Sequence, residues 1–196
     1  MSFSNVLAGL LFCFTLLISG CASPSASDKA AAEPVKVLME TSMGNIVLEL
    51  DPEHAPVTVE NFLAYADSGF YDGTIIHRVV PGFVIQGGGH DVNMNLKKTS
   101  PPIINEWQNG LKNVRGTIAM AREGGQADSA TSQFFINLVD NPRLDLPRDG
   151  SGYAVFGKVI NGMDVVDAIA AVNTTTHGEY ENVPVEPVIV KHVRRL

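Results

Sequence analysis

Short β-rich runs recur along most of this chain, and only two segments have helical periodicity; no other feature of the sequence constrains the fold as strongly. The stretch "VKVLMETSMGNIVLELDP" contains two such runs about a short turn near residues 42–44, and the second alternates in side-chain character as a half-buried strand does. Further runs lie near residues 75–80, 84–86, 117–121, 133–138, 153–159 and 188–193. Many short strands with few helices predict an antiparallel barrel or sandwich rather than a parallel sheet with alternating helices.

Two segments are predicted to be helices. Apolar residues of the first, within 56–69, fall at i, i+3, i+4 and i+7, namely Val59, Phe62, Leu63 and Ala66. Pro56 suits the first turn of this helix and Gly69 suits its C-terminal end. The second begins at Gly162 and places Met163, Val166, Ile169 and Ala170 on one face. Between residues 87 and 114 the periodicity is weak, as in a long functional loop.

The composition fits one globular domain of moderate size. Of the 196 residues, 45% are hydrophobic and 18% are charged, which is enough for one packed core and too little for two. A nucleic-acid partner would need a clustered basic surface, and nothing in this sequence, whose net charge is −7, suggests one. No period of about 20 to 50 residues recurs, which argues against a solenoid or propeller.

The first twenty residues, 1–20, differ from the rest of the chain. They contain an uncharged apolar run of thirteen residues from Val6 to Ile18, with no lysine or arginine before it. This run is too short to cross a hydrocarbon core of about 30 Å as a helix, and its length is typical of an export signal. The following "ISGC" resembles the lipobox of bacterial lipoproteins, which implies cleavage before Cys21 and lipidation of its thiol, including palmitate. The alternative is an ordinary secretory signal with an incidental cysteine.

Residues 21–35 are predicted to be a tether between this signal and a domain that spans 36–196. They are rich in alanine, serine and proline and contain too little large apolar surface to form a core. The domain itself contains no cysteine, because the two cysteines of the chain are Cys13 and Cys21. A disulfide framework and a zinc–thiolate site in the domain are therefore excluded.

Four sequence blocks in the domain resemble the core motifs of the cyclophilins, which are peptidyl-prolyl cis–trans isomerases. They are "HRVVPGFVIQGG" (77–88), "GTIAMAR" (116–122), "SQFFINL" (132–138) and "GYAVFGKVINGMDVVDAI" (152–169). The blocks are in the order and spacing of that family, and the variant they resemble is the bacterial, exported form. The resemblance implies a mainly β fold, a closed eight-stranded antiparallel barrel capped by two helices, with a packed interior and a groove on its outer wall.

Arg78 is the residue in these blocks whose chemistry matches the reaction. Rotation about an X–Pro bond is slow, with a barrier of about 18–20 kcal/mol, because the planar imide has partial double-bond character. In the twisted state the prolyl nitrogen regains a lone pair and can accept a hydrogen bond. An arginine, always protonated and rich in donors, can supply that bond without proton transfer, and a bond made only in the twisted state is catalytic. Such a bond contributes roughly 1.5–3 kcal/mol, or about ten- to a hundredfold in rate.

The family resemblance implies roles for further residues of the groove. Arg78, Phe83 and Gln86 are predicted to be catalytic, with Gln86 bonding the substrate backbone and steadying Arg78. The predicted substrate-binding residues are Val84, Ala121, Arg122, Phe135, Leu144 and Tyr153. Phe83, Phe135 and Leu144 would hold the proline ring, and Val84 takes a place usually held by methionine. Ala121 would line the adjacent subsite, and the backbone of Arg122 would pair with the peptide. Tyr153 stands where animal members of the family have histidine.

One position departs from the family pattern. Arg143 stands where the family has an aromatic residue, often tryptophan, that helps to bind cyclosporin, so weak cyclosporin binding is expected.

Phe134 and Phe135 are adjacent on a strand and therefore face opposite sides, one filling the barrel and the other the groove.

The histidines are not predicted to act in catalysis or to bind a metal. Alternation along the strand turns His77 away from Arg78, and the mechanism needs no base. The remaining histidines, His54, His90, His177 and His192, lack metal-ligand spacing. No cofactor is expected.

The leading hypothesis is an enzyme: a lipid-anchored bacterial lipoprotein that isomerises X–Pro bonds in extracytoplasmic client proteins. By analogy with bacterial sorting, Ala22 after the cysteine favours the outer membrane, with the domain facing the periplasm, and a monomer is expected. The first alternative is a binding module in which the same groove holds proline-containing segments as a chaperone or adhesion surface. A structural lipoprotein with a degenerate groove is a further alternative, disfavoured because Arg78, Phe83, Gln86 and Phe135 are all present.

Overall fold

The computed structural model describes Met1 and residues 33–146 and 149–196. The predicted signal peptide (1–20), Cys21 and the tether up to residue 32 thus lie outside the described residues, apart from Met1. In the parts of the chain that the structure describes, the helices are too short or too polar to cross a membrane.

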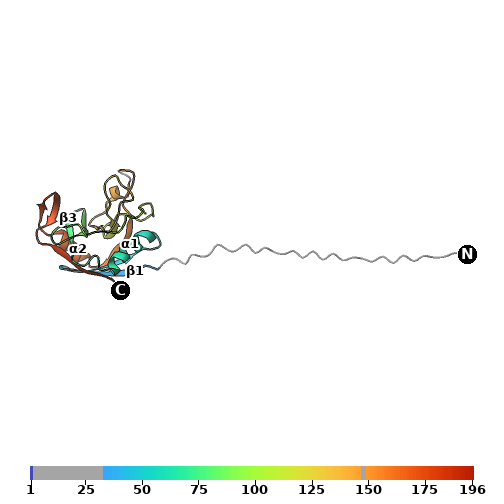
Figure 1. The fold of residues 1–196 in the computed structure, drawn as a ribbon, viewed down its shortest axis with the longest axis horizontal. Helices are drawn as coiled ribbons and strands as arrows, with labels where there is room; N and C mark the ends of the chain where they lie inside the picture. The colour runs from blue at the N-terminus through green and yellow to red at the C-terminus, as the bar shows by residue number, and fades with distance from the viewer. Residues whose placement is uncertain (2–32, 147–148) are drawn as a thin grey trace. The chain divides into compact units, whose positions relative to one another are not determined.

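Eight strands close into an antiparallel barrel, which confirms the predicted fold class (Figure 1). The barrel strands are β1 (Val35–Thr41), β2 (Gly44–Leu50), β3 (Thr74–Val80), β4 (Val84–Asp91), β5 (Thr117–Met120), β6 (Phe134–Asn137), β7 (Val155–Asn161) and β10 (Val188–Arg195). Their order around the barrel is β1-β10-β3-β4-β6-β5-β7-β2, and β2 lies next to β1, so the sheet has no free edge. Closure pairs the backbone groups that an open edge would leave exposed.

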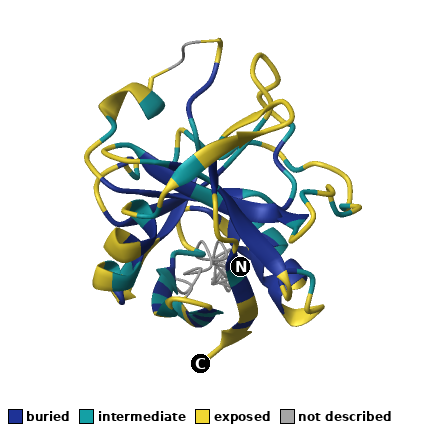
Figure 2. Cartoon of the chain, turned by 90° about the vertical axis from the view of Figure 1, so that its left-hand side faces the viewer, coloured by how far each residue is buried: buried dark blue, intermediate teal, exposed yellow. Residues whose placement is uncertain are grey.

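Alternation along each strand builds the core. From the third residue of both β1 and β2 onward, every second residue is buried and the residues between are half-buried, as the period of two requires. The inward side chains fill the barrel, and Figure 2 shows the buried strands at the centre with exposed loops around them. An aromatic cluster occupies one part of this core, where the Phe62 ring centroid lies 5.1–5.9 Å from those of Tyr71, Phe134 and Phe156.

Helix α1 (Pro56–Asp67) follows β2, and helix α2 (Met163–Ala170) follows β7. The predicted face of α1 is buried, and Phe62 has no exposed surface. Gly69 takes a left-handed conformation (φ 68°) just beyond α1, as its predicted role at the helix end requires. Gly162, at the start of α2, has φ 89°, and a Cβ there would lie 2.2 Å from the Asn45 backbone oxygen, so only glycine fits.

The long segment after β4 has no regular element before β5 except isolated bridges, yet it is fixed to the barrel. The Glu106 carboxylate accepts hydrogen bonds from the backbone N–H of Val57 (3.1 Å) and Thr58 (2.8 Å) and from the Thr58 hydroxyl (2.7 Å). These contacts satisfy free N–H groups at the N-terminus of α1, where a negative charge is stabilising. The neighbouring Trp107 packs against Gly152, where an added Cβ would lie 2.8 Å from the indole.

One hairpin outside the barrel was not predicted from the sequence. Strands β8 (Thr174–His177) and β9 (Tyr180–Pro184) pair with each other, and β9 lies alongside β3. In Figure 1 the hairpin is the red one beside the β3 label. Residues 175–181 are exposed, so these strands lack the alternation that reveals a half-buried strand.

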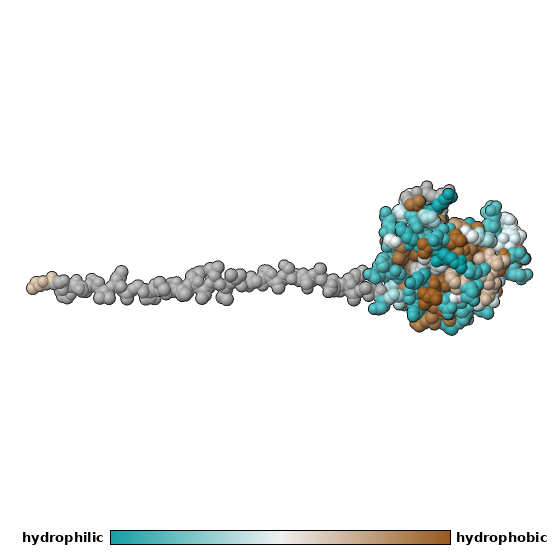
Figure 3. Space-filling model, turned by 180° about the vertical axis from the view of Figure 1, so that it is seen from behind, coloured by the Kyte–Doolittle hydropathy of each residue, from teal (hydrophilic) through white to brown (hydrophobic). Residues whose placement is uncertain are grey.

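The surface seen in Figure 3 is a mosaic of hydrophilic and hydrophobic areas. Brown areas are interrupted by teal ones on this face and do not merge into one large apolar face. Isolated apolar side chains are ordinary on the surfaces of folded domains.

Candidate active site

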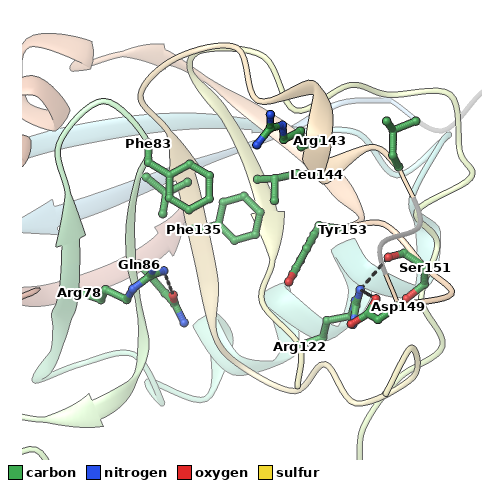
Figure 4. A pocket seen from close by; sticks show the side chains of 12 residues that line it. Arg78, Phe83, Gln86, Arg122, Phe135, Arg143, Leu144, Asp149, Ser151 and Tyr153 are labelled. Carbon is green, nitrogen blue, oxygen red and sulfur yellow. Dashed lines mark hydrogen bonds and ion pairs between the residues drawn. The ribbon is translucent and has the colours of Figure 1, made fainter. Parts of the chain in front are cut away.

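A pocket of about 420 Å³ opens on the outer wall of the barrel (Figure 4). Its lining residues come from β3, β4 and β6 and from the segments around residues 122 and 143–153. They are Arg78, Phe83, Val84, Gln86, Arg122, Phe135, Arg143, Leu144, Leu146, Asp149, Ser151 and Tyr153. The pocket therefore brings together eight of the nine groove residues named from the sequence. Ala121 is not in the lining, but it packs against the same apolar cluster behind it.

Strand β6 separates this pocket from the core. Phe134 belongs to the barrel core, whereas Phe135 belongs to a second apolar cluster with Val84, Ala119 and Val155. The prediction that the two phenylalanines face opposite sides is thereby confirmed. Both rings are buried, with exposed fractions of 0% and 5%, so the wall of the pocket is backed directly by the core.

Arg78 is held by a chain of amide side chains. Arg78 on β3 and Gln86 on β4 are cross-strand partners, and Nη1 of Arg78 donates to Oε1 of Gln86 at 3.2 Å. Nε2 of Gln86 in turn donates to Oε1 of Gln133 at 3.1 Å. Gln133, which stands in the "SQFFINL" block next to Phe134, was not predicted to be a site residue. Because one guanidinium nitrogen is engaged here, the other donors of Arg78 keep their capacity for a ligand.

Aromatic and aliphatic side chains form a slot beside Arg78. The guanidinium carbon of Arg78 lies 6.0 Å from the Phe83 ring centroid, and the Phe135 and Tyr153 rings meet edge to face at 5.6 Å. Figure 4 shows Phe83, Phe135, Leu144 and Tyr153 around one hollow, with Arg78 and Gln86 along one side. An apolar slot bordered by a charged donor can hold a small hydrophobic ring and place a hydrogen bond against it.

The backbone of Phe83 is fixed from behind. Its carbonyl oxygen accepts hydrogen bonds from the Leu138 N–H (2.9 Å) and from Nδ2 of Asn141 (3.1 Å). Asn141 also donates to Oδ1 of the buried Asn137 at 2.8 Å. These bonds join the turn that carries Phe83 to the end of β6, so the slot rests on rigid elements.

The side chain of Arg122 organises the opposite wall, a role that the sequence did not reveal. Its exposed fraction is 2%, and its guanidinium donates to the backbone oxygens of Gly152 (3.1 Å) and Ser151 (2.7 Å) and pairs with Asp149 (2.6 Å). It also stacks on the Tyr153 ring, 4.6 Å from the centroid. The hydrogen bonds that Arg122 donates to the Asp149 carboxylate hold the pKa of Asp149 well below its usual range and raise the pKa of Arg122, so the pair stays ionised. The predicted pairing of the Arg122 backbone with a peptide stays a prediction.

His77 is buried on the side of β3 away from the slot, as alternation predicts. Its ring lies 4.4 Å from that of His90, centroid to centroid. Burial, aided by the neighbouring His90 and Arg78, lowers the pKa of His77 to about 3, and burial also lowers the pKa of His90. Among the described residues, no three histidine, cysteine or acidic side chains are grouped as metal ligands.

Comparison with known proteins identifies the family. The sequence profile of the cyclophilin type peptidyl-prolyl cis-trans isomerase family matches residues 36–195. The chain belongs to this family. It is 54% identical over 165 residues to peptidyl-prolyl cis-trans isomerase A of Dickeya dadantii, covering 84% of this chain and 86% of the relative. It is 51% identical over 160 residues to isomerase B of Escherichia coli, covering 80% and 97%.

A solved structure agrees with this assignment. The crystal structure of a cyclophilin type isomerase from Cryptosporidium parvum superposes with a TM-score of 0.69 at 27% identity, over 83% of this chain and 98% of that one. With relatives above 50% identity over most of the chain bearing the same name, the protein is a peptidyl-prolyl cis-trans isomerase. The expectation of an enzyme is thus confirmed.

Replacement of Arg122 by methionine is expected to loosen the wall that carries Tyr153. The change removes donors from two backbone carbonyls and from Asp149, so the free energy of unfolding should fall by roughly 2–3 kcal/mol and kcat/KM by about tenfold. Urea unfolding and a prolyl-peptide assay measure the two effects. The matched control is Arg194→Met, which breaks the exposed pair with Glu40 and should cost about 1 kcal/mol or less with unchanged kcat/KM. Equal effects from both variants would contradict the assigned role.

Stability is expected to fall as the pH drops below about 6.5. Because the pKa of His77 is lower in the folded than in the unfolded state, the unfolded state binds the proton first, and stability is lost between pH 6.5 and about 3. The slope from this one group is about 1.4 kcal/mol per pH unit. Urea unfolding at pH 7, 6 and 5 should show a shallower slope for His77→Gln than for the wild type, whatever its absolute stability. An unchanged slope in His77→Gln would contradict this assignment.

Proposed function

We propose that this isomerase accelerates X–Pro bond rotation in proteins that fold outside the cytoplasm, while a lipid on Cys21 anchors it to a bacterial membrane. The proposal has two parts: a mechanism that centres on Arg78, and an export and anchoring route that depends on residues 1–35. The first is supported by the geometry of the pocket, and the second by the sequence pattern alone.

In the proposed mechanism, the slot holds the proline ring while the preceding carbonyl rotates. Phe83, Phe135 and Leu144 contact the ring, and Arg78 donates to the prolyl nitrogen as it becomes pyramidal in the twisted state. The planar imide nitrogen of either ground state cannot accept this bond, so the interaction lowers the barrier without stabilising substrate or product. Gln86 fixes the guanidinium, and no proton is transferred.

The observation that carries this mechanism is the position of Arg78 between the slot and a neutral partner. Its hydrogen bond runs to the Gln86 amide oxygen, and among the described residues no carboxylate lies within ion-pair distance of it. An arginine held by an amide keeps its full positive charge for the substrate. An arginine paired with a carboxylate would not.

The proposed anchoring depends on "ISGC" at residues 18–21 and on the apolar run before it. Cleavage before Cys21 would leave the domain 36–196 attached to a lipidated cysteine through residues 21–35. We also propose an outer-membrane position facing the periplasm, a monomer, and weak cyclosporin binding, the last because an exposed Arg143 on the pocket rim replaces the aromatic residue expected there.

Substitution of Arg78 tests the mechanism. Arg78→Ala should lower kcat/KM by about ten- to a hundredfold, the value of one charged hydrogen bond, and Arg78→Lys should restore only part of it, because a lysine lacks the planar fork held by Gln86. Line-shape NMR on a short X–Pro peptide measures the exchange rate. The exposed Arg194→Ala should match the wild type.

A wild-type rate for Arg78→Ala would contradict the mechanism. Protection of an unfolded client from aggregation, measured on the same variant, separates client binding from turnover. Retained protection with lost turnover would mean that the groove binds clients independently of catalysis.

Substitution of Cys21 tests the anchor. Cells that express the full chain and are labelled with a fatty-acid probe should show label on the wild type and on Cys13→Ala, because residue 13 is removed with the signal. Cys21→Ala should carry none and should leave the membrane fraction. Labelling that persists in Cys21→Ala would exclude this site.

A further inference from the structure

A second hollow, of about 470 Å³, adjoins the active-site pocket. Its lining residues are His77, Arg78, Gln86, His90, Leu96, Gln133, Glu179, Tyr180, Glu181 and Asn182. Arg78 and Gln86 also line the first pocket, so the two depressions meet along the Arg78–Gln86–Gln133 hydrogen-bonded chain. A peptide seated in the proline slot would pass this chain to reach the second hollow.

The outer wall of the second hollow is the tip of the β8–β9 hairpin. Glu179 lies in the turn, and Tyr180, Glu181 and Asn182 are in β9. Asn182 has a left-handed backbone (φ 60°), which interrupts the regular strand next to the acidic residues. Glu179 and Glu181 are exposed, and among the described residues neither forms an ion pair.

Two buried imidazoles line the inner side. His77 and His90 are 4% and 3% exposed, and Nδ1 of His77 and both ring nitrogens of His90 have no hydrogen-bond partner within the described part of the chain. The rings of Tyr180 and His90 are nearly perpendicular, and their centroids lie 5.1 Å apart. The lowered pKa of each histidine keeps the imidazole neutral near pH 7. The two rings thus add no positive charge to the hollow.

The charge balance of the hollow favours a cation. Two free carboxylates face one guanidinium, which already bonds Gln86, and the histidines add no charge. A lysine or arginine side chain could meet the carboxylates at the rim while its apolar stem lies against Leu96 and Tyr180. Among the described residues, no three of these imidazoles and carboxylates are grouped as metal ligands, so the residues fit an organic cation better.

From this arrangement we infer that the second hollow is a specificity site, which binds a lysine or arginine side chain of the client within a few residues of the isomerised proline. An extended chain advances about 3.3–3.6 Å per residue, so a side chain one to three residues from the proline can cross from the slot past Arg78. The inference rests on the isomerase activity and adds a preference that the activity itself does not require.

Exchange NMR on matched peptides tests this inference. Each peptide carries one Ala–Pro bond, with lysine, glutamine or glutamate placed one, two or three residues to either side of the proline. At low ionic strength, kcat/KM for the best lysine position should exceed that of its glutamine counterpart by about three- to tenfold and that of glutamate by more. The preference should shrink in about 0.5 M salt, because the carboxylates are exposed.

Substitution of the two glutamates tests whether the lysine preference arises in the second hollow. Glu179→Gln with Glu181→Gln should reduce the lysine preference to about onefold while turnover of the glutamine peptides stays unchanged. Glu186→Gln, a control that removes an exposed carboxylate outside the hollow, should leave the preference intact. Three results overturn the inference: no lysine preference at any position, a preference that survives the double substitution, or an equal loss in Glu186→Gln. Turnover of the glutamine peptides distinguishes these outcomes from failure of the isomerase itself.

Discussion

Alternation along β6 is the constraint on which most of this isomerase depends. The Phe134 side chain points into the barrel and packs with Phe62 and Tyr71. The side chain of its neighbour Phe135 points to the other face of the strand, where it forms the floor of the slot. Core and pocket are therefore two faces of one sheet. Since closure of the barrel leaves the sheet without an edge, the face that carries the pocket is supported on every side by paired strands.

The two arginines of the pocket differ in their partners. Arg78 is held by an amide and keeps its charge available, whereas Arg122 is buried and donates to Asp149 and to two backbone carbonyls of the opposite wall. The surroundings of the two side chains therefore differ although their chemistry is the same. A neutral partner leaves an arginine free to act on a ligand, and a carboxylate with several carbonyls makes it a structural clamp.

The sequence predicted the parts of the molecule that carry periodic or family-wide signals. The strands, the helix at residues 56–69 and the grouping of Phe83, Gln86 and Phe135 with Arg78 followed from alternation, helical spacing and motif blocks. The β8–β9 hairpin was missed because its strands are exposed on both faces for most of their length. The support from Arg122 was missed because its partners lie 27 to 30 residues away in an irregular segment, and no local pattern predicts such contacts.

The anchoring of the long irregular segment links distant parts of the protein. Glu106 ties that segment to the first turn of α1, and the adjacent Trp107 presses on Gly152, whose carbonyl is bound by Arg122 behind Tyr153. The first turn of α1 is thus connected, through successive contacts, to the rim of the pocket. A substitution in that turn therefore has a physical route to the pocket wall that involves none of the residues lining the apolar slot.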